Sequence, residues 1–320
     1  MLPIPNFKGF DFFPHDTRIN FMRFKSVCFW GSIVAMVLSL ALFAVKGLNL
    51  GVDFKGGSMI EVQTKKGAAN ITELRSKLGG LGIGDVQIQQ FGQPNEVLIR
   101  MEQQPGGEEA QQAALKKITD ALGDGFVQRR VEVVGPAVSS ELRRDGILAI
   151  LGAIAAIIAY VWFRFEWQFA LGTVVALTHD VLITVGVFSL FNLEFDLSIV
   201  AALLTILGYS VNDTVVVSDR IRENLRKFRR MDLNELLNLS INETLSRTIL
   251  TGATTIAVLI ALYVFGGSVI RNFTFAMLFG VVVGTYSSIF IAAPILDYFG
   301  IKRETVVGTK VAGISDKPKV

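Results

Sequence analysis

The sequence predicts a multi-pass α-helical membrane protein that carries a ferredoxin-like α+β domain outside the membrane. Hydrophobic residues make up 51% of the 320-residue chain and charged residues only 18%, with a mean hydropathy of +0.49. A soluble domain usually has about one quarter charged residues. The apolar residues also occur in blocks of roughly 20, the length that spans a bilayer.

Six apolar blocks predict six membrane spans. The first span follows a polar tail, residues 1–26, and the absence of a convincing cleavage site predicts a retained anchor. A hydrophilic domain at 48–145 separates it from five further spans. The predicted spans are residues 27–47, 146–163, 168–190, 197–217, 248–265 and 273–298.

Lysine and arginine predict the orientation. They gather in the N-terminal tail, in a basic loop at 218–247 and in a C-terminal tail at 299–320, whereas the connection Phe191–Asp196 carries only acidic charges. Cytoplasmic segments of membrane proteins carry an excess of Lys and Arg. We therefore expect both termini in the cytoplasm and the 48–145 domain on the opposite side.

The hydrophilic domain has the pattern β-α-β-β-α-β, which is typical of the ferredoxin-like split arrangement. Four stretches alternate as strands and two have helical spacing, with the first helix starting near Asn70 or Thr72. No convergent acids, histidines or thiols occur in it, so we expect a docking or substrate-contact module. The strands are "GGSMIEVQT", "DVQIQQF", "NEVLIRMEQ" and "FVQRRVEVVG", and the helices are "NITELRSKLGG" and "GEEAQQAALKKITDALG".

Ionisable residues inside the predicted spans indicate a functional site, because each costs about 2.5–3.5 kcal/mol on insertion scales. Asp180 lies near the middle of its span, next to His179. Helical spacing places it in a narrow polar stripe. That stripe consists of Thr173, Ala176, Asp180 and Thr184.

Asp213 and Arg247 are predicted to lie at a similar depth on adjacent helices. Pairing would offset part of the desolvation cost, and an arginine that approached and withdrew would let the carboxyl take up and release a proton. Their predicted polar neighbours are Tyr209, Asn212, Thr251 and Thr254. By contrast, we expect Asp180 and Asp213 at depths too different for a pair of catalytic acids.

Simpler interpretations remain open for these residues. Arg247 can extend to the interface, Asp213 can be a static hydrogen-bond partner between helices, and His179 is expected to be packed. Gly280 and Gly284 are expected to let two helices approach closely.

The sequence predicts no enzyme, metal or cofactor site. The single Cys28 excludes an intrachain disulfide, and the two histidines are far apart without ligand spacing. The net charge of +3 gives no indication of nucleic-acid binding.

Several motifs, in order, resemble the SecD/SecF family over roughly residues 21–300. In "GVDFKGG" we expect Gly51, Asp53, Gly56 and Gly57 to be structural, since glycines suit a sharp exit from helix to strand. The remaining motifs are "VGPAVSSELRRDG", "ALTHD", "GYSVNDTVVVSDRIREN", "SRTILTGATT" and "GTYSSIFIA".

This resemblance implies a bacterial inner-membrane subunit with half of a resistance–nodulation–division unit and a periplasmic 48–145 domain. It implies partnership with SecD and the SecYEG channel, with YajC and YidC as further candidates, and contact with emerging unfolded polypeptides. It further implies that proton flow assists late steps of export, with Asp213, Arg247 and Thr251 on the pathway, where we also place Asp180. Two alternatives remain: a stand-alone proton-coupled exporter of small molecules, and a structural scaffold that moves no protons.

Overall fold

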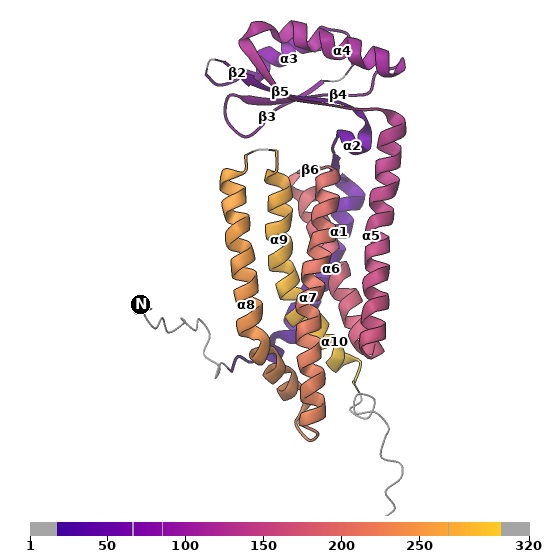
Figure 1. Cartoon of the computed structure of the whole chain (residues 1–320), viewed down its shortest axis with the longest axis vertical. Coiled ribbons are helices and arrows are strands. Elements are labelled where there is room, and N and C mark those ends of the chain that lie inside the picture. Colours follow the sequence, from indigo (N-terminus) through magenta and orange to yellow (C-terminus); the bar gives the residue numbers. More distant parts are fainter. Residues whose placement is uncertain (1–17, 66, 85, 268, 302–320) are drawn as a thin grey trace, which may run out of the picture.

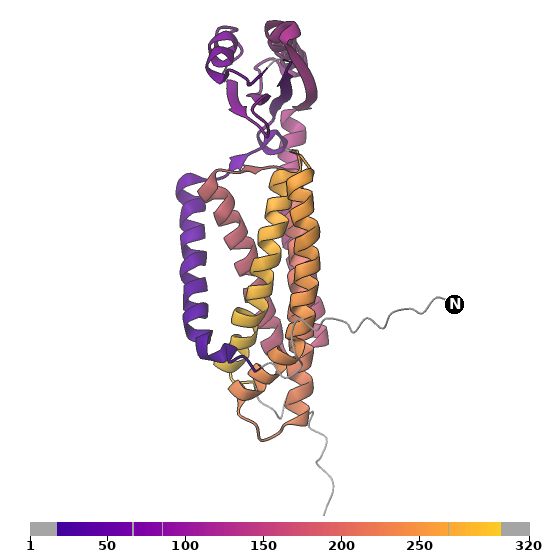
Figure 2. The same cartoon turned by 90° about the vertical axis from the view of Figure 1, so that its left-hand side faces the viewer.

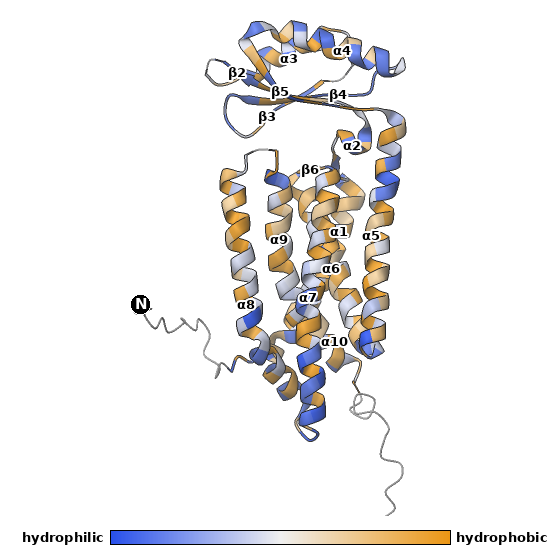
Figure 3. Cartoon of the chain, viewed as in Figure 1, coloured by the Kyte–Doolittle hydropathy of each residue, from blue (hydrophilic) through white to orange (hydrophobic). Residues whose placement is uncertain are grey.

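The computed structural model describes residues 18–301 except 66, 85 and 268, and it consists of a helical bundle with an α+β domain at one end (Figure 1). Within that part of the chain, six helical segments are long and apolar enough to cross a membrane, which confirms the six predicted spans. Both predicted tails lie largely outside the described residues. Figure 3 shows the apolar middle of the bundle and its hydrophilic end away from the domain.

The bundle has three inner and three outer helical segments. The inner ones are about half buried along their apolar stretch, whereas the outer ones expose most of it. In Figure 2 the N-terminal outer helix, α1 (indigo), stands at one side of the bundle, where it packs on α6. The inner segments are α6 (Trp167–Phe191), α7 (Leu197–Lys227) and α9 (Arg271–Ser287), which η3 (Ser288–Ala292) and α10 (Ala293–Tyr298) continue; the outer helices are α1 (Lys25–Lys46, after η1, Phe21–Phe24), α5 (Pro136–Arg164) and α8 (Leu233–Phe265).

The segment 218–247, expected as a basic loop, is mostly helical. Helix α7 continues to Lys227 and α8 begins at Leu233, so only a short turn separates them. The reason is amphipathicity: both extensions bury apolar side chains at helical spacing, while charged residues cover their outer sides. The buried side chains are Ile221, Leu225, Leu236, Leu237 and Ile241.

The α+β domain confirms the predicted ferredoxin-like order. Its sheet has the strand order β3-β4-β2-β5 with every neighbouring pair antiparallel, and both helices cover one face (Figure 1). The Asn70 side chain caps the first helix by accepting from the Glu73 N–H at 3.2 Å. The elements are β2 (Gly57–Thr64), α3 (Ile71–Gly79), β3 (Val86–Gln90), β4 (Glu96–Met101), α4 (Gly107–Leu122), η2 (Gly123–Gly125) and β5 (Phe126–Val134).

The two faces of this sheet have different roles. Ile60, Val62 and Ile99 point toward the helices and pack around Ile118 of α4 in the core. Alternation along the strands sends the other side chains to the face that looks toward the bundle. The domain therefore has a core of its own between its helices and its sheet, and the other sheet face is directed toward the membrane helices.

The "GVDFKGG" segment joins the domain to the bundle. It contains the short helix α2 (Val52–Lys55), and before it β1 (Asn49–Leu50) pairs in parallel with β6 (Glu194–Phe195) of the α6–α7 connection. The Asp53 carboxylate accepts the Leu197 N–H at 2.9 Å, which caps the start of α7. Gly57 has a φ of 115°, and a Cβ there would lie 2.4 Å from the Met101 carbonyl oxygen.

Because the domain has its own core, we expect a fragment of residues 51–138 to fold alone. In that fragment Ile118→Ala, which empties a fully buried site, should lower the free energy of unfolding by about 2–5 kcal/mol. The exposed neighbour Lys116→Ala is the control and should change it by less than about 0.5 kcal/mol. Urea unfolding followed by circular dichroism measures both. A fragment without a cooperative transition contradicts the autonomous domain.

Candidate functional site

The site is built on two carboxylates buried inside the bundle. Asp180 of α6 is fully buried, as is the rest of its predicted stripe at Thr173, Ala176 and Thr184. Its Oδ2 accepts hydrogen bonds from the Ser210 hydroxyl at 2.5 Å and the Ser287 hydroxyl at 2.9 Å. These contacts tie α6 to α7 and α9 at one point.

Asp213 of α7 has a parallel arrangement. Its side chain is nearly buried; Oδ1 accepts from the Thr248 hydroxyl at 2.6 Å, and Oδ2 accepts from the Ser288 hydroxyl. Three helical segments, α7, α8 and η3, therefore meet at this carboxylate. Hydroxyl donors offset part of the cost of taking a carboxylate out of water.

The two carboxylates are linked through consecutive serines. Ser287 ends α9 and bonds Asp180, while Ser288 begins the π-helical turn η3 and bonds Asp213. A π-helical turn shifts the register of side chains around a helix, and such turns are frequent at functional sites. The expectation that Asp180 and Asp213 lie at different depths is wrong, since neighbouring residues contact both.

Each of these serines has a second acceptor within its own helix. The Ser287 hydroxyl also lies 3.1 Å from the Gly284 carbonyl oxygen, and the Ser288 hydroxyl 3.0 Å from that of Thr285. A hydroxyl has one hydrogen but can also accept. If a carboxyl becomes protonated, it can donate to its serine, and the serine can donate to its own helix. The site thus satisfies its hydrogen bonds in both protonation states.

Arg247 does not pair with Asp213 in this structure. The arginine is exposed, and no ion pair between described residues includes it. Its neighbour Thr248 makes the contact to Asp213 instead. The residue type proposed for a charge partner is therefore present on α8, but the two side chains form no direct ion pair.

The other predicted neighbours form an exposed polar strip along α7 and α8. Asn212, Thr251 and Thr254 are exposed, and the Thr254 hydroxyl bonds the Leu250 carbonyl oxygen of its own helix at 3.0 Å. Tyr209 is half-buried, and its hydroxyl lies 3.5 Å from where a Cβ on Gly252 would be. This strip lies beside Asp213 and is open on the outside of the bundle.

His179 continues the hydrogen-bonded system toward α1. Its Nδ1 lies 2.9 Å from Oδ1 of Asp180, and its ring lies 5.9 Å from that of Tyr286. The Tyr286 hydroxyl donates to the Cys28 carbonyl oxygen at 3.0 Å and lies 2.9 Å from the Ser32 hydroxyl. The histidine is buried, as the packed interpretation expects.

Two glycines allow the close contact that the serines require. A Cβ on Gly280 would lie 2.3 Å from Cδ1 of Ile206, and one on Gly284 would lie 3.1 Å from Cβ of Ser210. Helix α9 can therefore approach α7 closely enough for hydroxyl contacts. The sequence analysis did not single out Ser210, Thr248, Ser287 and Ser288, although all four lie within the family motifs quoted there.

Comparison with known proteins identifies the family. The model described as "Protein export membrane protein SecD/SecF, C-terminal" matches residues 114–302, and that described as "SecD/SecF GG Motif" matches residues 41–68. The protein translocase subunit SecF of Cereibacter sphaeroides is 45% identical over 315 residues, covering 94% of this chain and 97% of the relative. The chain belongs to the SecD/SecF family.

Fused SecD/SecF relatives extend this result. The protein translocase subunit SecDF of Brucella abortus is 45% identical over 299 residues, which are 93% of this chain but 39% of the relative. The crystal structure of SecDF from Thermus thermophilus, a translocon-associated membrane protein, matches with a TM-score of 0.81 and 36% identity, covering 89% of this chain and 39% of that one. A super-membrane-facing form of SecDF matches with a TM-score of 0.66 and 35% identity. In these relatives the part that matches this chain belongs to a longer SecDF chain.

The packing of α9 on α7 gives a testable prediction. Gly280→Ala places a methyl group against a β-branched side chain that has little rotamer freedom, so it should destabilise the bundle by about 1–3 kcal/mol and lower its thermal midpoint. Gly152→Ala is the matched control, because nothing lies within 4 Å of its Cβ position. Thermal unfolding in detergent measures both.

Ile206→Ala alone should also destabilise the bundle, because it leaves a space beside Gly280. The double change Ile206→Ala/Gly280→Ala should be more stable than Ile206→Ala alone, because the added methyl group fills part of that space. Equal midpoints for Gly280→Ala and Gly152→Ala contradict the close contact.

Proposed function

We propose that this chain is the SecF subunit of the auxiliary complex of the Sec translocase. With a SecD partner, it uses the proton motive force to assist late steps of protein export across the inner membrane, and it is not an enzyme. The observation that supports proton use is the pair of serine-linked carboxylates, Asp180 and Asp213. Their hydroxyl partners allow a proton to bind and leave without stranding a buried polar group.

The exposed polar strip supports the SecD partner. Hydrocarbon leaves polar side chains unsatisfied, and such groups in membrane helices usually face protein or water. Asn212, Arg247 and Thr251 are exposed beside Asp213, so a helical partner that covers this strip would supply their contacts. Such a partner would also complete an enclosed path around Asp213. In this proposal Arg247 pairs with a carboxylate only when the partner or a conformational change brings one within reach.

The two alternative functions, a stand-alone exporter and a static scaffold, require different properties of this chain. A stand-alone small-molecule exporter would have to work with the polar strip uncovered. A static scaffold would need hydrogen bonds at Asp213 but no ionisation there. Activity that depends on both SecD and an ionisable Asp213 supports the proposed function over both.

Asp213→Asn tests the proton step. The amide keeps the size of the side chain and much of its hydrogen bonding but cannot ionise, so proton flux through vesicles containing the chain with SecD should fall at least about tenfold. The matched control is Asp219→Asn, an exposed carboxylate two turns further along the same helix. A pH-sensitive dye inside the vesicles reports flux.

Expression and copurification with SecD should be unchanged by either substitution. Normal flux and export with Asp213→Asn would leave the scaffold as the better description. Flux that persists in vesicles lacking SecD would favour the stand-alone exporter.

The proposed periplasmic position of the α+β domain is tested by cysteine labelling. In a Cys28→Ser background, we expect an impermeant maleimide to label Gln93→Cys in intact spheroplasts but Glu235→Cys only after lysis, because the basic segments favour the cytoplasm. Both positions are exposed, so labelling reports access from each side rather than burial. The reverse pattern would contradict the orientation.

A further inference from the structure

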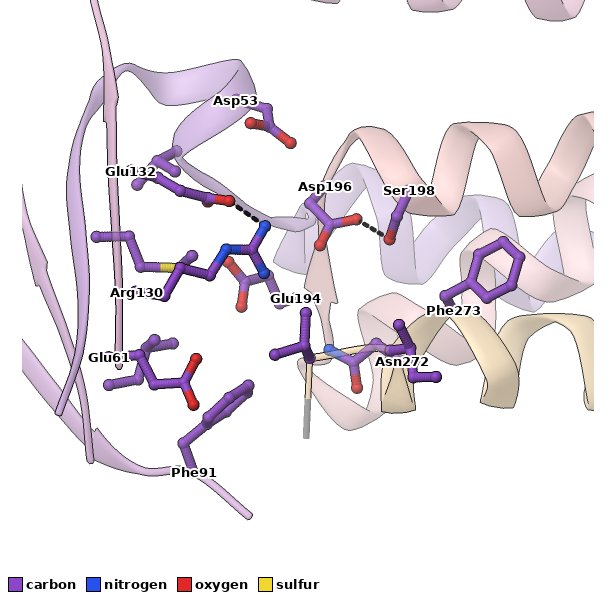
Figure 4. Close-up of a pocket in the computed structure, with 15 residues that line it drawn as sticks. Asp53, Glu61, Phe91, Arg130, Glu132, Glu194, Asp196, Ser198, Asn272 and Phe273 are labelled. Atoms are coloured by element: carbon purple, nitrogen blue, oxygen red, sulfur yellow. Dashed lines mark hydrogen bonds and ion pairs between the residues drawn. The ribbon is translucent and has the colours of Figure 1, made fainter. Parts of the chain in front are cut away.

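A cavity of about 560 Å³ lies between the bundle-facing side of the sheet in the α+β domain and the end of the bundle (Figure 4). We call it the junction cavity. The sheet contributes Met59, Glu61 and Leu98, while the α6–α7 connection and the start of α9 contribute Asp196 and Phe273. Its volume is in the range of ligand pockets, and it is separate from the buried carboxylates.

The junction cavity is strongly acidic, with five carboxylates and one guanidinium among the residues that line it. Four of the carboxylates already have partners within the protein, so they help to build the walls. These four are Asp53 on the Leu197 N–H, Asp196 on the Ile199 N–H and the Ser198 hydroxyl, Glu132 on Arg130, and Glu194 on Arg100.

Glu61 is the exception. The residue is only 7% exposed, and no hydrogen bond or ion pair between described residues includes its carboxylate. Arg130, which lies opposite it on β5, forms its ion pair with Glu132 instead. Figure 4 shows its carboxylate pointing into the junction cavity. Burial, with the nearby Glu96 charge as a smaller cause, raises its pKa above the ordinary value for a glutamate, although the charges of Arg130 and Arg129 oppose this. Because this carboxylate has no direct hydrogen bond or ion pair among the described residues, a cation that entered the cavity could pair with it.

The residue types that line the junction cavity indicate which kind of cation it suits. Among the described residues, no three His, Cys, Asp or Glu side chains converge to hold a metal ion. Apolar side chains adjoin the acids instead, including Met59, Phe91, Leu98 and Phe273. This combination suits a Lys or Arg side chain flanked by apolar residues, since such side chains have an apolar stem and a charged head.

The flexible lining favours a variable occupant. Met59, Glu61 and Arg130 are long side chains on one sheet face, and methionine adapts to differently shaped apolar groups. A fixed contact between two subunits does not need such adaptability, whereas a passing chain of varied sequence does.

We propose that the junction cavity is a binding site for basic, partly apolar segments of a polypeptide in transit, and that Glu61 receives the Lys or Arg side chain. This proposal rests on the proposed export function for the identity of the occupant. The site would hold such a segment next to the point where the domain meets the start of α7.

Binding of a defined peptide to the full chain in nanodiscs tests the proposal. The probe is a fluorescein-labelled Leu-Lys-Phe-Lys-Leu peptide, and the comparison peptide is Leu-Glu-Phe-Glu-Leu; fluorescence anisotropy gives both affinities. The basic peptide should bind at least about tenfold more tightly, and Glu61→Gln should weaken it by roughly tenfold. The control Glu108→Gln removes an exposed carboxylate from α4, on the other side of the sheet, and should have no effect.

Three results would overturn the proposal: no binding of the basic peptide, equal affinity for both peptides, or equal effects of Glu61→Gln and Glu108→Gln. Displacement of the peptide by purified SecD would assign the cavity to the partner subunit and also overturn it. Asp213→Asn should leave peptide affinity unchanged. The flux assay therefore tests the proposed function and the peptide assay tests the junction cavity, so either proposal can fail without the other.

Discussion

The structure depends on keeping two carboxylates inside an apolar bundle. Asp180 and Asp213 are stable there because hydroxyls from neighbouring helices donate to them. This requirement explains several features together. The π-helical turn η3 directs two consecutive serines to two different acids, and small residues at Gly280 and Gly284 let the helices approach. Without that approach, the hydroxyls could not reach the acids.

The same inner helices connect the carboxylates to the α+β domain. The β1–β6 pairing, the Asp53 cap on α7 and the Arg100–Glu194 ion pair all join the domain to the beginning of the helix that carries Asp213. Burial raises the pKa of Glu194 above its ordinary value, although Arg100 opposes this. A shift of the domain would therefore act directly on α7.

The distribution of polar groups separates three surfaces. The inner faces hold the acids and their hydroxyls, while the outer faces of α1 and α5 are largely apolar, as lipid requires. The strip that includes Asn212 and Thr251 differs from both, because it is polar and exposed at membrane depth. In the proposed function, this strip is the surface that a helical partner would cover.

The sequence alone predicts the six spans, the ferredoxin-like domain and the position of Asp180 and Asp213 within apolar helices, because hydropathy and local periodicity carry that information. It did not predict that 218–247 is mostly helical. Buried residues such as Leu225 and Leu236 are surrounded in the sequence by charged residues, which lower the average hydropathy of the segment. Nor did it determine the partners of the acids. Ser287, Ser288 and Thr248 are common residue types in membrane helices, and only the packing of α9 and α8 against α7 decides which hydroxyl reaches which carboxylate. Arg247 is the converse case: opposite charge and similar depth predicted a pair, but the rotation of α8 about its axis, which tertiary contacts set, presents Thr248 to Asp213 instead.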